Sequence, residues 1–582
     1  MSRWRSPVRI RSGPPSNAFF YAPFARPNGA FLCPPGDTIR VVQPRTLLAV
    51  AVLITLVEAC GGSPASGEPA SAEPSASTVL TPTPAAVSEA PVTAEPSPSE
   101  SIEPSVAPPP VAAAGSVAVV PVTNFRSAFS STSPAEVASV LAGASTRYDA
   151  LELVSGEADA ILAAVGTTRP SDASRLALAS STEALARDLS AHRKRLAVIR
   201  ADAVSERVRA LAWGGESLFG VGRVASLALW PLKANLPAAG APRYDPAKAW
   251  TLVAGGDILL DRGVARTIKI LGKGVDFPFA GGTASITSRY CCSSFGWNLP
   301  RTVRTDTTGA VRRLVHGADL AIANFENPAP NNFAYHTKGT VFSADPRLID
   351  GLRNAGIDYV SLANNHIRDA GAQGVLDTIA NLDKRGIAHS GAGANLAAAR
   401  RPSILRAGGV RVAILAYDTI AKGYAATSTR VGSAQLSAAA VRADVAAARR
   451  AGADVVIVFP HWGTEYDPTP FAGQQRLAHA CIDAGADLVI GNHAHWAGAI
   501  ETYKGKPIWY ALGNFVFDQT WSEPTMEGIT LELTFRGADL VQVRMRPHVI
   551  LDKAQPNFMD PTGSGRVVMG QVFNASKGLL AW

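Results

Sequence analysis

The strongest constraint on the fold is a series of apolar segments, spread over residues 250–549, that each end in polar residues. Helix-like stretches such as GVLDTIANLDKRG and LSAAAVRADVAAARRAG lie between these segments. Strands that alternate with helices are typical of a layered α/β fold, so the sequence predicts that fold class. The segments with the length and composition of buried strands are TLVAGGDI, ADLAIANFE, DYVSLANNH, RVAILAYD, DVVIVFPHWG, DLVIGNHAH and PIWYALGNFVF.

The polar residues at the ends of these segments form the candidate site. Ligands of open α/β sheets bind at the carboxyl ends of the strands, where such residues would gather. Taken alone, Asp257 also fits a turn or cap, and His461 a hydrogen-bonded core histidine. Together they predict one shared site. Its candidate residues are Asp257, Glu326, Asn365, His366, His461, His493 and His495.

His493 and His495 make a metal the favoured ligand of that site. On an extended strand end, side chains two residues apart share a face, so both imidazoles would point into one site. Neutral imidazole is the commonest metal ligand in proteins. Carboxylates together with imidazoles suit Zn, Mn or Fe rather than Ca. The sequence therefore predicts a divalent metal site.

Six stretches carry a family resemblance, in this order: GGDILLDRGV (255–264), ANFENP (323–328), VSLANNHIRDAGAQGVLDT (360–378), HSGAGANLAAAR (389–400), VFPHWGTEYDPTP (458–470) and IGNHAHWAGAIETYKGKPIWYALGNFVFDQ (490–519). The order GD, N-x-E, NNH, H and H-x-H resembles the calcineurin-like metallophosphoesterases. More narrowly, it resembles the CapA family, named for capsule and poly-γ-glutamate synthesis.

The resemblance implies a four-layer α/β/β/α sandwich with two divalent metals held by loops at the edge of the sheets. Glu326 matches a carboxylate that bridges the metals, and His366 matches a histidine that gives a proton to a leaving group. The implied ligands are Asp257 and His495 for one metal, and Asn365, His461 and His493 for the other.

The sequence also departs from the wider superfamily. The usual D-x-H motif is replaced here by Asp257, Ile258 and Leu259, so one imidazole ligand is missing. Asp261 or a water is expected to fill that position. The bridging residue is Glu rather than the shorter Asp. Weaker binding of the first metal is therefore expected.

Three further residues are candidates for supporting roles. Asp369 follows His366 by three positions and is expected either to orient that imidazole or to cap a helix. Glu465 lies close to His461 in the sequence and is a candidate substrate or supporting contact. Asn514, in LGNF, is a second candidate substrate contact, with a purely structural role as the alternative.

These features leave more than one function open. The first is a metal-dependent hydrolase that acts on a phosphoester or on an amide-linked anionic envelope polymer such as poly-γ-glutamate, which the retained His366 favours. The second is a non-catalytic assembly factor that binds such a polymer, within a capsule-synthesis membrane complex, which the missing D-x-H imidazole favours. A solute-binding lipoprotein, with residues 116–237 as the working part, is the third reading.

The first sixty residues predict export. RTLLAVAVLITLVEAC, from Arg45, has one positive charge before a short apolar run, as a signal peptide does. Ala59 before Cys60 resembles a bacterial lipobox, although Glu58 departs from it. We expect an extracytoplasmic protein anchored to the membrane by a lipid on Cys60, with an uncleaved anchor as the alternative. Residues 1–40 are Arg- and Pro-rich and suggest a true start further along the chain.

The rest of the chain divides by composition. Residues 61–115 are rich in Pro, Ala and Ser and predict a disordered stalk. Residues 116–237 predict a small α/β domain, which resembles half of a periplasmic solute-binding domain. Within it Ser133 is a helix cap, and KRLAVIRADAVSERVRALAWGGESLFG predicts strand, helix and loop. The resemblance implies a CapA-type domain over residues 248–550, with 551–582 as a C-terminal extension.

Charge and cysteine content exclude some classes of protein. The net charge of the 582 residues is +8, but no Lys/Arg run is interleaved with aromatics, so nucleic acid is not an expected partner. Residues 281–305 predict an insertion or long loop. Cys291 and Cys292 in that loop are expected to pair elsewhere or to stay reduced. Cys481, in a helical stretch, is expected to be buried.

Overall fold

The computed structural model describes residues 114–237, 243–293, 295–307 and 309–582. The leader, Cys60 and almost all of the predicted stalk lie outside the described residues. Within the described ranges, no helix is both long and apolar enough to cross a membrane.

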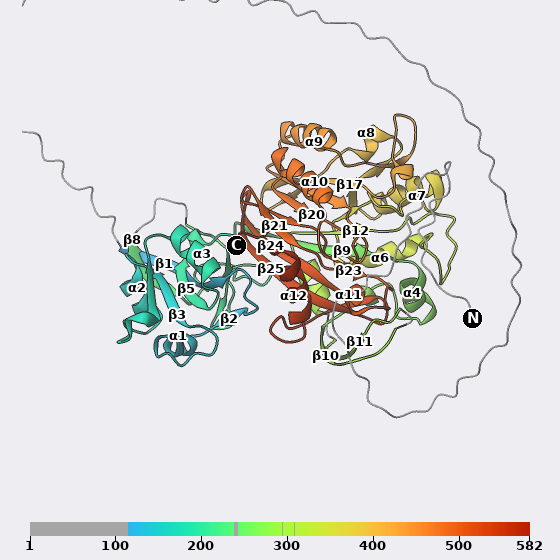
Figure 1. Ribbon diagram of the computed structural model, residues 1–582. Helices are drawn as coiled ribbons and strands as arrows, with labels where there is room; N and C mark the ends of the chain where they lie inside the picture. Colours follow the sequence, from blue (N-terminus) through green and yellow to red (C-terminus); the bar gives the residue numbers. More distant parts are fainter. Residues whose placement is uncertain (1–113, 238–242, 294, 308) are drawn as a thin grey trace, which may run out of the picture. The chain divides into compact units, whose positions relative to one another are not determined.

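Two sheets build the region from residue 249 onward (Figure 1). The larger has the order β11-β10-β26-β25-β24-β9-β12-β13-β14, with β23 also paired to β9. Its strands are β9 (Ala249–Ile258), β10 (Thr283–Tyr290), β11 (Leu299–Asp306), β12 (Leu320–Phe325), β13 (Tyr359–Ser361), β14 (Ala388–Ser390), β23 (Asn514–Val516), β24 (Glu527–Arg536), β25 (Asp539–Leu551) and β26 (Gln555–Phe558).

The smaller of these two sheets has the order β16-β17-β19-β20-β22-β21. In both sheets the central strands run parallel: β9, β12, β13 and β14 in one, and β17, β19, β20 and β22 in the other. The carboxyl ends of parallel strands lie at one edge of their sheet. The strands of the smaller sheet are β16 (Ser403–Ala407), β17 (Val410–Asp418), β19 (Val455–His461), β20 (Leu488–Ile490), β21 (Ile500–Tyr503) and β22 (Lys506–Trp509).

Alternation of side chains along each strand produces four layers. On β12, Leu320 and Ile322 join a core that also contains Val455 and Ile457 of β19, so the two sheets pack on each other. The intervening residues face outward. Ala321 of β12 packs with the helices of one outer layer, and the alternate residues of β19 pack with the helices of the other. The fold is therefore the predicted α/β/β/α sandwich.

The helices of the outer layers lie between the strands in the chain, as the sequence predicted (Figure 1). Cys481 is a free thiol buried on α10, which confirms the expectation for that cysteine. The helices of this region are α4 (Arg262–Ala265), α5 (Ala310–His316), α6 (Asp350–Ala355), α7 (Gly371–Asp383), α8 (Leu396–Ala399), α9 (Ala438–Arg450), α10 (Ala472–Asp483), α11 (Glu523–Met526) and α12 (Arg566–Ala575).

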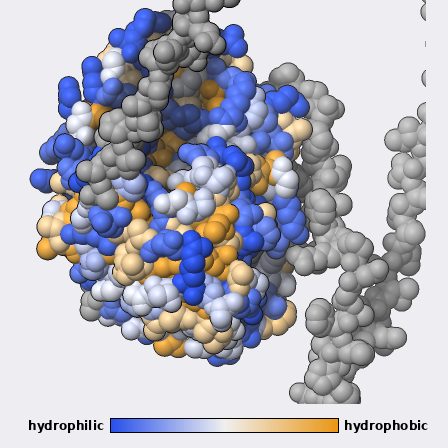
Figure 2. All heavy atoms as spheres, turned by 90° about the vertical axis from the view of Figure 1, so that its left-hand side faces the viewer, coloured by the Kyte–Doolittle hydropathy of each residue, from blue (hydrophilic) through white to orange (hydrophobic). Residues whose placement is uncertain are grey.

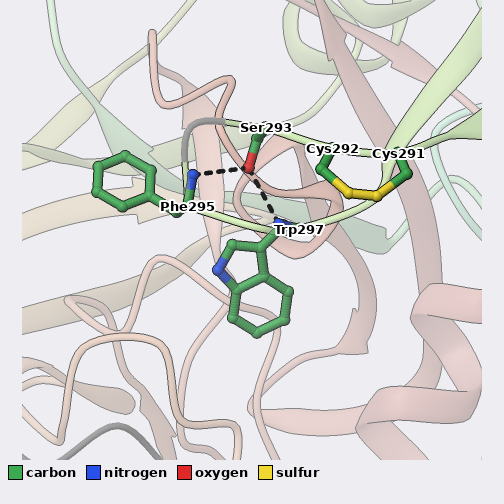
Figure 3. The surroundings of a disulfide bond; sticks show 5 residues. All are labelled: Cys291, Cys292, Ser293, Phe295 and Trp297. Carbon is green, nitrogen blue, oxygen red and sulfur yellow. Dashed lines mark hydrogen bonds between the residues drawn. A yellow bond between two sulfur atoms is a disulfide. The ribbon is translucent and has the colours of Figure 1, made fainter. Parts of the chain in front are cut away.

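Most of the segment 281–305 lies in the antiparallel hairpin of β10 and β11, so a long loop was wrong, while an insertion stays a prediction. Strands β10 and β11 pair with each other and extend the edge of the larger sheet next to β26. At the tip of the hairpin Cys291 and Cys292 form a disulfide with each other, which corrects the expectation that they would pair elsewhere or stay reduced (Figure 3). Ser293 Oγ accepts hydrogen bonds from the backbone N–H groups of Phe295 and Trp297.

The chain from 114 to 237 contains a sheet of its own, with the order β4-β3-β5-β1-β6 and with β8 paired to β1. Ser133 caps its first helix as predicted, since the Ser133 side chain accepts from the Glu136 N–H. The elements are β1 (Ala114–Asn124), α1 (Pro134–Leu141), β3 (Ala150–Val154), α2 (Ala158–Ala164), β4 (Leu176–Ala179), α3 (Thr182–Ala191), β5 (Arg195–Arg200), β6 (Val208–Ala210) and β8 (Lys233–Pro237).

The helix predicted after β5 is wrong. After one short turn (Ala201–Ala203), the chain forms β6, which pairs with β1. All three side chains of β6 are buried. Pairing with a neighbouring strand has overridden the local helix preference, as tertiary contacts often do.

On the face in Figure 2, hydrophobic patches are broken up by hydrophilic residues.

The chain from 551 to the end continues the fold. Strand β26 lies between β25 and β10 in the larger sheet, and Val568 and Val572 of α12 join the core between the two sheets. Two short pairs complete the described structure: β2 (Ser131–Thr132) with β7 (Ala212–Trp213), and β15 (Ala392–Gly393) with β18 (Gly432–Ser433).

Candidate metal centre

The predicted site residues gather at the carboxyl ends of the strands. Asp257 stands one residue before the end of β9, and Glu326 directly follows β12. His461 is the last residue of β19 and forms a bridge with Asn492, which follows β20. Side chains from both sheets therefore meet at one place, although the residues that carry them are far apart in the sequence.

Glu326 lies at the centre of this cluster. It belongs to two groups of potential metal ligands, one with Asp257 and His495 and the other with His461 and His493. Within each group the ligand atoms lie within 4.8 Å of one another. Glu326 Oε1 is 3.6 Å from His461 Nε2 and 3.7 Å from His495 Nε2. The structure therefore brings together the two predicted sets around the predicted shared carboxylate.

Asn365 completes the second group. Its Oδ1 lies 2.7 Å from His461 Nε2, and the same nitrogen is 3.0 Å from His493 Nδ1. Three polar atoms thus converge on one point from β19, from the loop after β13 and from the loop after β20. Each of these loops follows a buried strand that fixes its starting position.

The backbone at His493 and His495 differs from the expectation. Both residues have left-handed backbone angles, with φ of 98° and 57°, so the segment is not extended. The two imidazoles reach the same site through a tight turn, and their ring centroids lie 6.1 Å apart. The convergence was predicted, but the reason given for it was wrong. Left-handed residues other than glycine are uncommon and cost roughly 1–3 kcal/mol where the side chain is constrained.

Asn514 supports His495 from behind. Its Nδ2 donates to the Thr525 carbonyl, which fixes the amide so that Oδ1 faces His495 Nδ1 at 2.9 Å. His495 Nδ1 therefore carries the proton, and His495 Nε2 presents its lone pair toward Glu326. Asn514 is fully buried. This corrects its prediction as a substrate contact, because a buried amide engaged on both sides cannot reach a substrate.

Asn324 is a supporting residue that sequence reasoning did not assign. Its Nδ2 donates to Asp257 Oδ1 at 2.7 Å and lies 3.2 Å from His461 Nδ1. It therefore links the two sheets at the site. The signal was present in the N-x-E pattern, since residues two apart on a strand share a face.

Burial sets the protonation of the cluster. Burial raises the pKa of Asp257 to about 7, and burial together with the nearby Asp257 raises the pKa of Glu326 well above its ordinary value. Burial also lowers the pKa of His495 to about 3 and that of His461 and His493 well below the ordinary range. The imidazoles are neutral, as metal ligands must be.

The residues present fit a divalent cation. Both carboxylate oxygens of Glu326 are buried, and while the neighbouring Asp257 is ionised they receive no hydrogen bond from the described residues. A buried carboxylate without partners is costly unless a cation compensates it. Carboxylate, amide and imidazole groups around it supply a suitable set of ligands. The cluster could therefore hold a metal.

His366 lies beside this cluster and is oriented by Asp369. His366 Nδ1 is 2.8 Å from Asp369 Oδ2. Asp369 also accepts from the Phe342 N–H at 2.8 Å and from the Tyr424 hydroxyl at 3.0 Å. Of the two roles considered for Asp369, helix capping is wrong, because the cap position of α7 is Ala370. Tyr424 was missed, since it lies far from His366 in the sequence.

Two predicted residues lie around the cluster and outside its two groups. Glu465 is half-buried, and burial raises the pKa of its carboxyl. Asp261 caps α4 and accepts from the Ser343 N–H at 2.7 Å, so the expectation that it replaces the missing imidazole was wrong. Ile258 and Leu259 are buried in apolar clusters.

Comparison with known proteins places these motifs in a family. Residues 251–519 match the model of "Bacterial capsule synthesis protein PGA_cap". The chain is 36% identical over 220 residues to a capsule biosynthesis protein CapA from Bacillus anthracis. That match covers 36% of this chain and 54% of the relative, so it spans about half of the relative's length.

A second relative is covered more fully. A "Probable polyglutamine synthesis accessory protein" from Mycobacterium tuberculosis is 32% identical over 335 residues, which cover 53% of this chain and 82% of the relative. Among solved structures, a calcineurin-like phosphoesterase from Bacillus subtilis matches 57% of this chain and 97% of its own at 10% identity, with a TM-score of 0.30. The chain belongs to the CapA family of bacterial capsule synthesis proteins.

Proposed function

We propose that this protein is an exported, metal-dependent hydrolase that acts on an anionic capsule polymer. The observation that carries the proposal is Glu326, whose two buried oxygens receive no hydrogen bond from ionised neighbours in the described part of the chain and which is shared by two groups of ligands. Glu326 is shared by a group with Asp257 and the imidazole of His495 and by a group with the imidazoles of His461 and His493, which favours two cations. Mn, Zn and Fe suit this set of ligands.

Each metal would be held by residues from different strand ends. Asp257, Glu326 and His495 would hold one, and Glu326, Asn365, His461 and His493 the other. When bound, such cations supply Lewis-acid activation of an anionic substrate and of an attacking water. The chain itself fixes the ligands. Asn514 keeps His495 Nε2 unprotonated and aimed at the cluster, and Asn324 holds Asp257.

His366 is the proposed proton donor to the leaving group. Asp369 engages its Nδ1 and so leaves Nε2 as the nitrogen that exchanges a proton. Asp369 is itself held by the Phe342 N–H and the Tyr424 hydroxyl, which limits rotation of the pair. General acids of this kind contribute about 10²–10⁴-fold to a rate. Glu465, whose carboxyl interacts electrostatically with the His366 imidazole, is the proposed substrate contact.

The substrate and location rest on the relatives and on the leader. Relatives are described as proteins of capsule and polyglutamine synthesis, so poly-γ-glutamate is the first polymer to test. The apolar leader and Cys60 support export, lipid anchoring outside the cytoplasm and work within a capsule-synthesis membrane complex. Residues 116–237 and 248–550 are proposed as separate functional regions, with β26 of 551–582 completing the larger sheet of the second.

A non-catalytic assembly factor is the second candidate function. Leu259 stands where the wider superfamily has an imidazole, and it is buried in an apolar cluster. One metal would therefore have three protein ligands, one of them shared. On this reading the centre binds carboxylates of the polymer without cleaving them.

Metal content and turnover, measured together, test the proposal. We expect two metals per wild-type chain and cleavage of either a phosphodiester or poly-γ-glutamate. His493→Ala should lose one metal and the turnover. His192→Ala is the matched control, because His192 is exposed and pairs with Asp188 away from the site. Metal binding with polymer binding and no turnover would select the assembly factor. A wild-type chain without metal would refute both.

A further inference from the structure

Arg262 is a cation near the candidate metal centre that no role so far explains. It follows the GGDILLD segment and is the first residue of α4. Its guanidinium lies 4.9 Å from the Phe342 ring centroid and 6.0 Å from that of Phe517. Phe342 packs on His366 at 4.2 Å between centroids, and Phe517 packs on His495 at 4.9 Å. Arg262 is thus one aromatic ring away from each of two site histidines.

The guanidinium is held in place by two contacts, but one of its N–H donors has no acceptor among the described residues. Its Nη1 donates to the Gly339 carbonyl at 2.9 Å, and its Nη2 pairs with Asp518. Its Nε is buried and has no hydrogen-bond partner among the described residues. A buried N–H without an acceptor costs about 1–3 kcal/mol, so a ligand that supplies the acceptor would be favoured. The side chain is 15% exposed, which leaves a route from solvent.

Backbone strain also assigns Arg262 to this site. Among the described residues, seven residues other than glycine have left-handed φ angles. Four of them surround the candidate centre: Arg262, Tyr466, His493 and His495. Arg262 has a φ of 47°. Strain of this kind persists where the surrounding structure enforces a functional geometry, and here it directs an arginine and two histidines into the same region.

The charge of Arg262 complements the cluster. Through the Phe342 and Phe517 rings, its guanidinium lies near His366 and His495 of the site. Its planar fork matches the oxygens of phosphoryl and carboxylate groups, to which charge-assisted hydrogen bonds are the stronger kind. With metals on one side and this guanidinium on the other, an anion would be held between fixed positive charges.

We propose that Arg262 is a substrate-binding residue whose guanidinium, held by Asp518 and Gly339, binds an anionic oxygen of the substrate beside the metal centre. The proposal rests on the proposed function for the place of the metals. It adds that the site selects an oxyanion, phosphoryl or carboxylate, through a residue that is not a metal ligand.

Calorimetric titration of the manganese-treated full-length protein with inorganic phosphate, and separately with glutarate, tests the proposal. Arg262→Gln should weaken binding of at least one anion about 10- to 100-fold, the loss expected for one charge-assisted hydrogen bond. Its manganese content should stay that of the wild type. The titrant that loses more affinity identifies the phosphoryl or carboxylate class.

Two further variants control the measurement. Arg169→Gln removes the same charge from an exposed ion pair with Asp159 and should bind both anions as the wild type does. Arg262→Lys keeps the charge without the fork and should lie between wild type and Arg262→Gln, which also covers the case that the glutamine variant fails to fold.

Three outcomes are distinguishable. Equal anion affinity of wild type and Arg262→Gln, at equal manganese content, would overturn the proposal. So would a wild type that binds manganese and neither anion. A wild type without manganese whose phosphate binding still depends on Arg262 would refute the proposed function and support this inference.

Discussion

At the scale of single residues, the site depends on amides that hold the ligands. Asn514 and Asn324 are both fully buried, and each contacts a candidate ligand. Residues that orient metal ligands commonly change metal affinity by about 10–100-fold when they are replaced. A motif of ligands does not reveal such residues, because they act by hydrogen bonds to the ligands: Asn514 to the His495 imidazole and Asn324 to the Asp257 carboxylate.

Asn514→Leu should lower the affinity for one metal by about 10–100-fold, because His495 loses the acceptor that fixes its tautomer. The measurement is a titration of the metal-free protein with Mn²⁺ or Zn²⁺, followed by elemental analysis. Asn331→Leu, at an exposed position, is the matched control. Unchanged affinity in Asn514→Leu would show that His495 is not a ligand through Nε2.

His548 predicts a dependence of stability on pH. Burial lowers its pKa to about 4, and its Nε2 lies 2.8 Å from the Asn514 carbonyl. The unfolded chain, with a pKa of about 6.5, binds the proton more readily, so the stabilisation is complete above about pH 6.5 and is lost as the pH falls toward 4. The change is on the order of 3 kcal/mol at most.

The measurement is urea unfolding of wild type and His548→Gln at pH 7 and pH 5 with chelator present. Other buried imidazoles titrate in the same range, so the difference between the two proteins carries the information. The variant should lose less stability than the wild type over this interval. Parallel losses would show that His548 is accessible to protons in the folded state.

At the scale of elements, Gly256 allows strand β9 to lie close to the backbone at Gly513. A Cβ on Gly256 would lie 1.8 Å from the Gly513 carbonyl oxygen, so the backbones that carry Asp257 and Asn514 approach closely. Gly256→Ala should therefore separate β9 from β23, lower the stability and release metal. Gly570→Ala is the control, because nothing lies within 4 Å of its added Cβ on α12.

In that helical position alanine should stabilise by roughly 0.5–1 kcal/mol. Thermal unfolding and metal content of both variants check the pair. A Gly256→Ala protein with normal stability and metal content would contradict the close approach of the two backbones.

The elements that the sequence predicted well are those buried on both faces. Strands such as β12 and β19 are continuous apolar runs because one face meets the other sheet and the opposite face meets helices. The hairpin β10–β11 was missed because it lies at an edge and is largely exposed, so its residues carry little apolar pattern. The site residues were predicted from their order along the chain, whereas the roles of Asn324, Tyr424 and Arg262 depend on contacts with residues distant in the sequence.

At the scale of the whole molecule, the C-terminal residues complete the larger sheet. Strand β26 joins the hairpin β10–β11 to β25, and the Ser576 hydroxyl accepts from the Ile500 N–H at 2.8 Å. Val568 and Val572 are buried in the core between the sheets. Removing a strand from within a sheet exposes unpaired backbone groups on both neighbours, which also promotes aggregation.

A chain that ends at residue 550 should therefore be insoluble, or should melt well below the wild type and bind no metal. A chain that begins at residue 109 is the control, because it retains every residue that the structure describes. The control should melt at the wild-type temperature and bind the same amount of metal. Circular dichroism melting and elemental analysis of the two truncated proteins provide the comparison. If the chain ending at 550 bound metal normally, the two sheets would hold the centre without β26, and the strand ends alone would define the site.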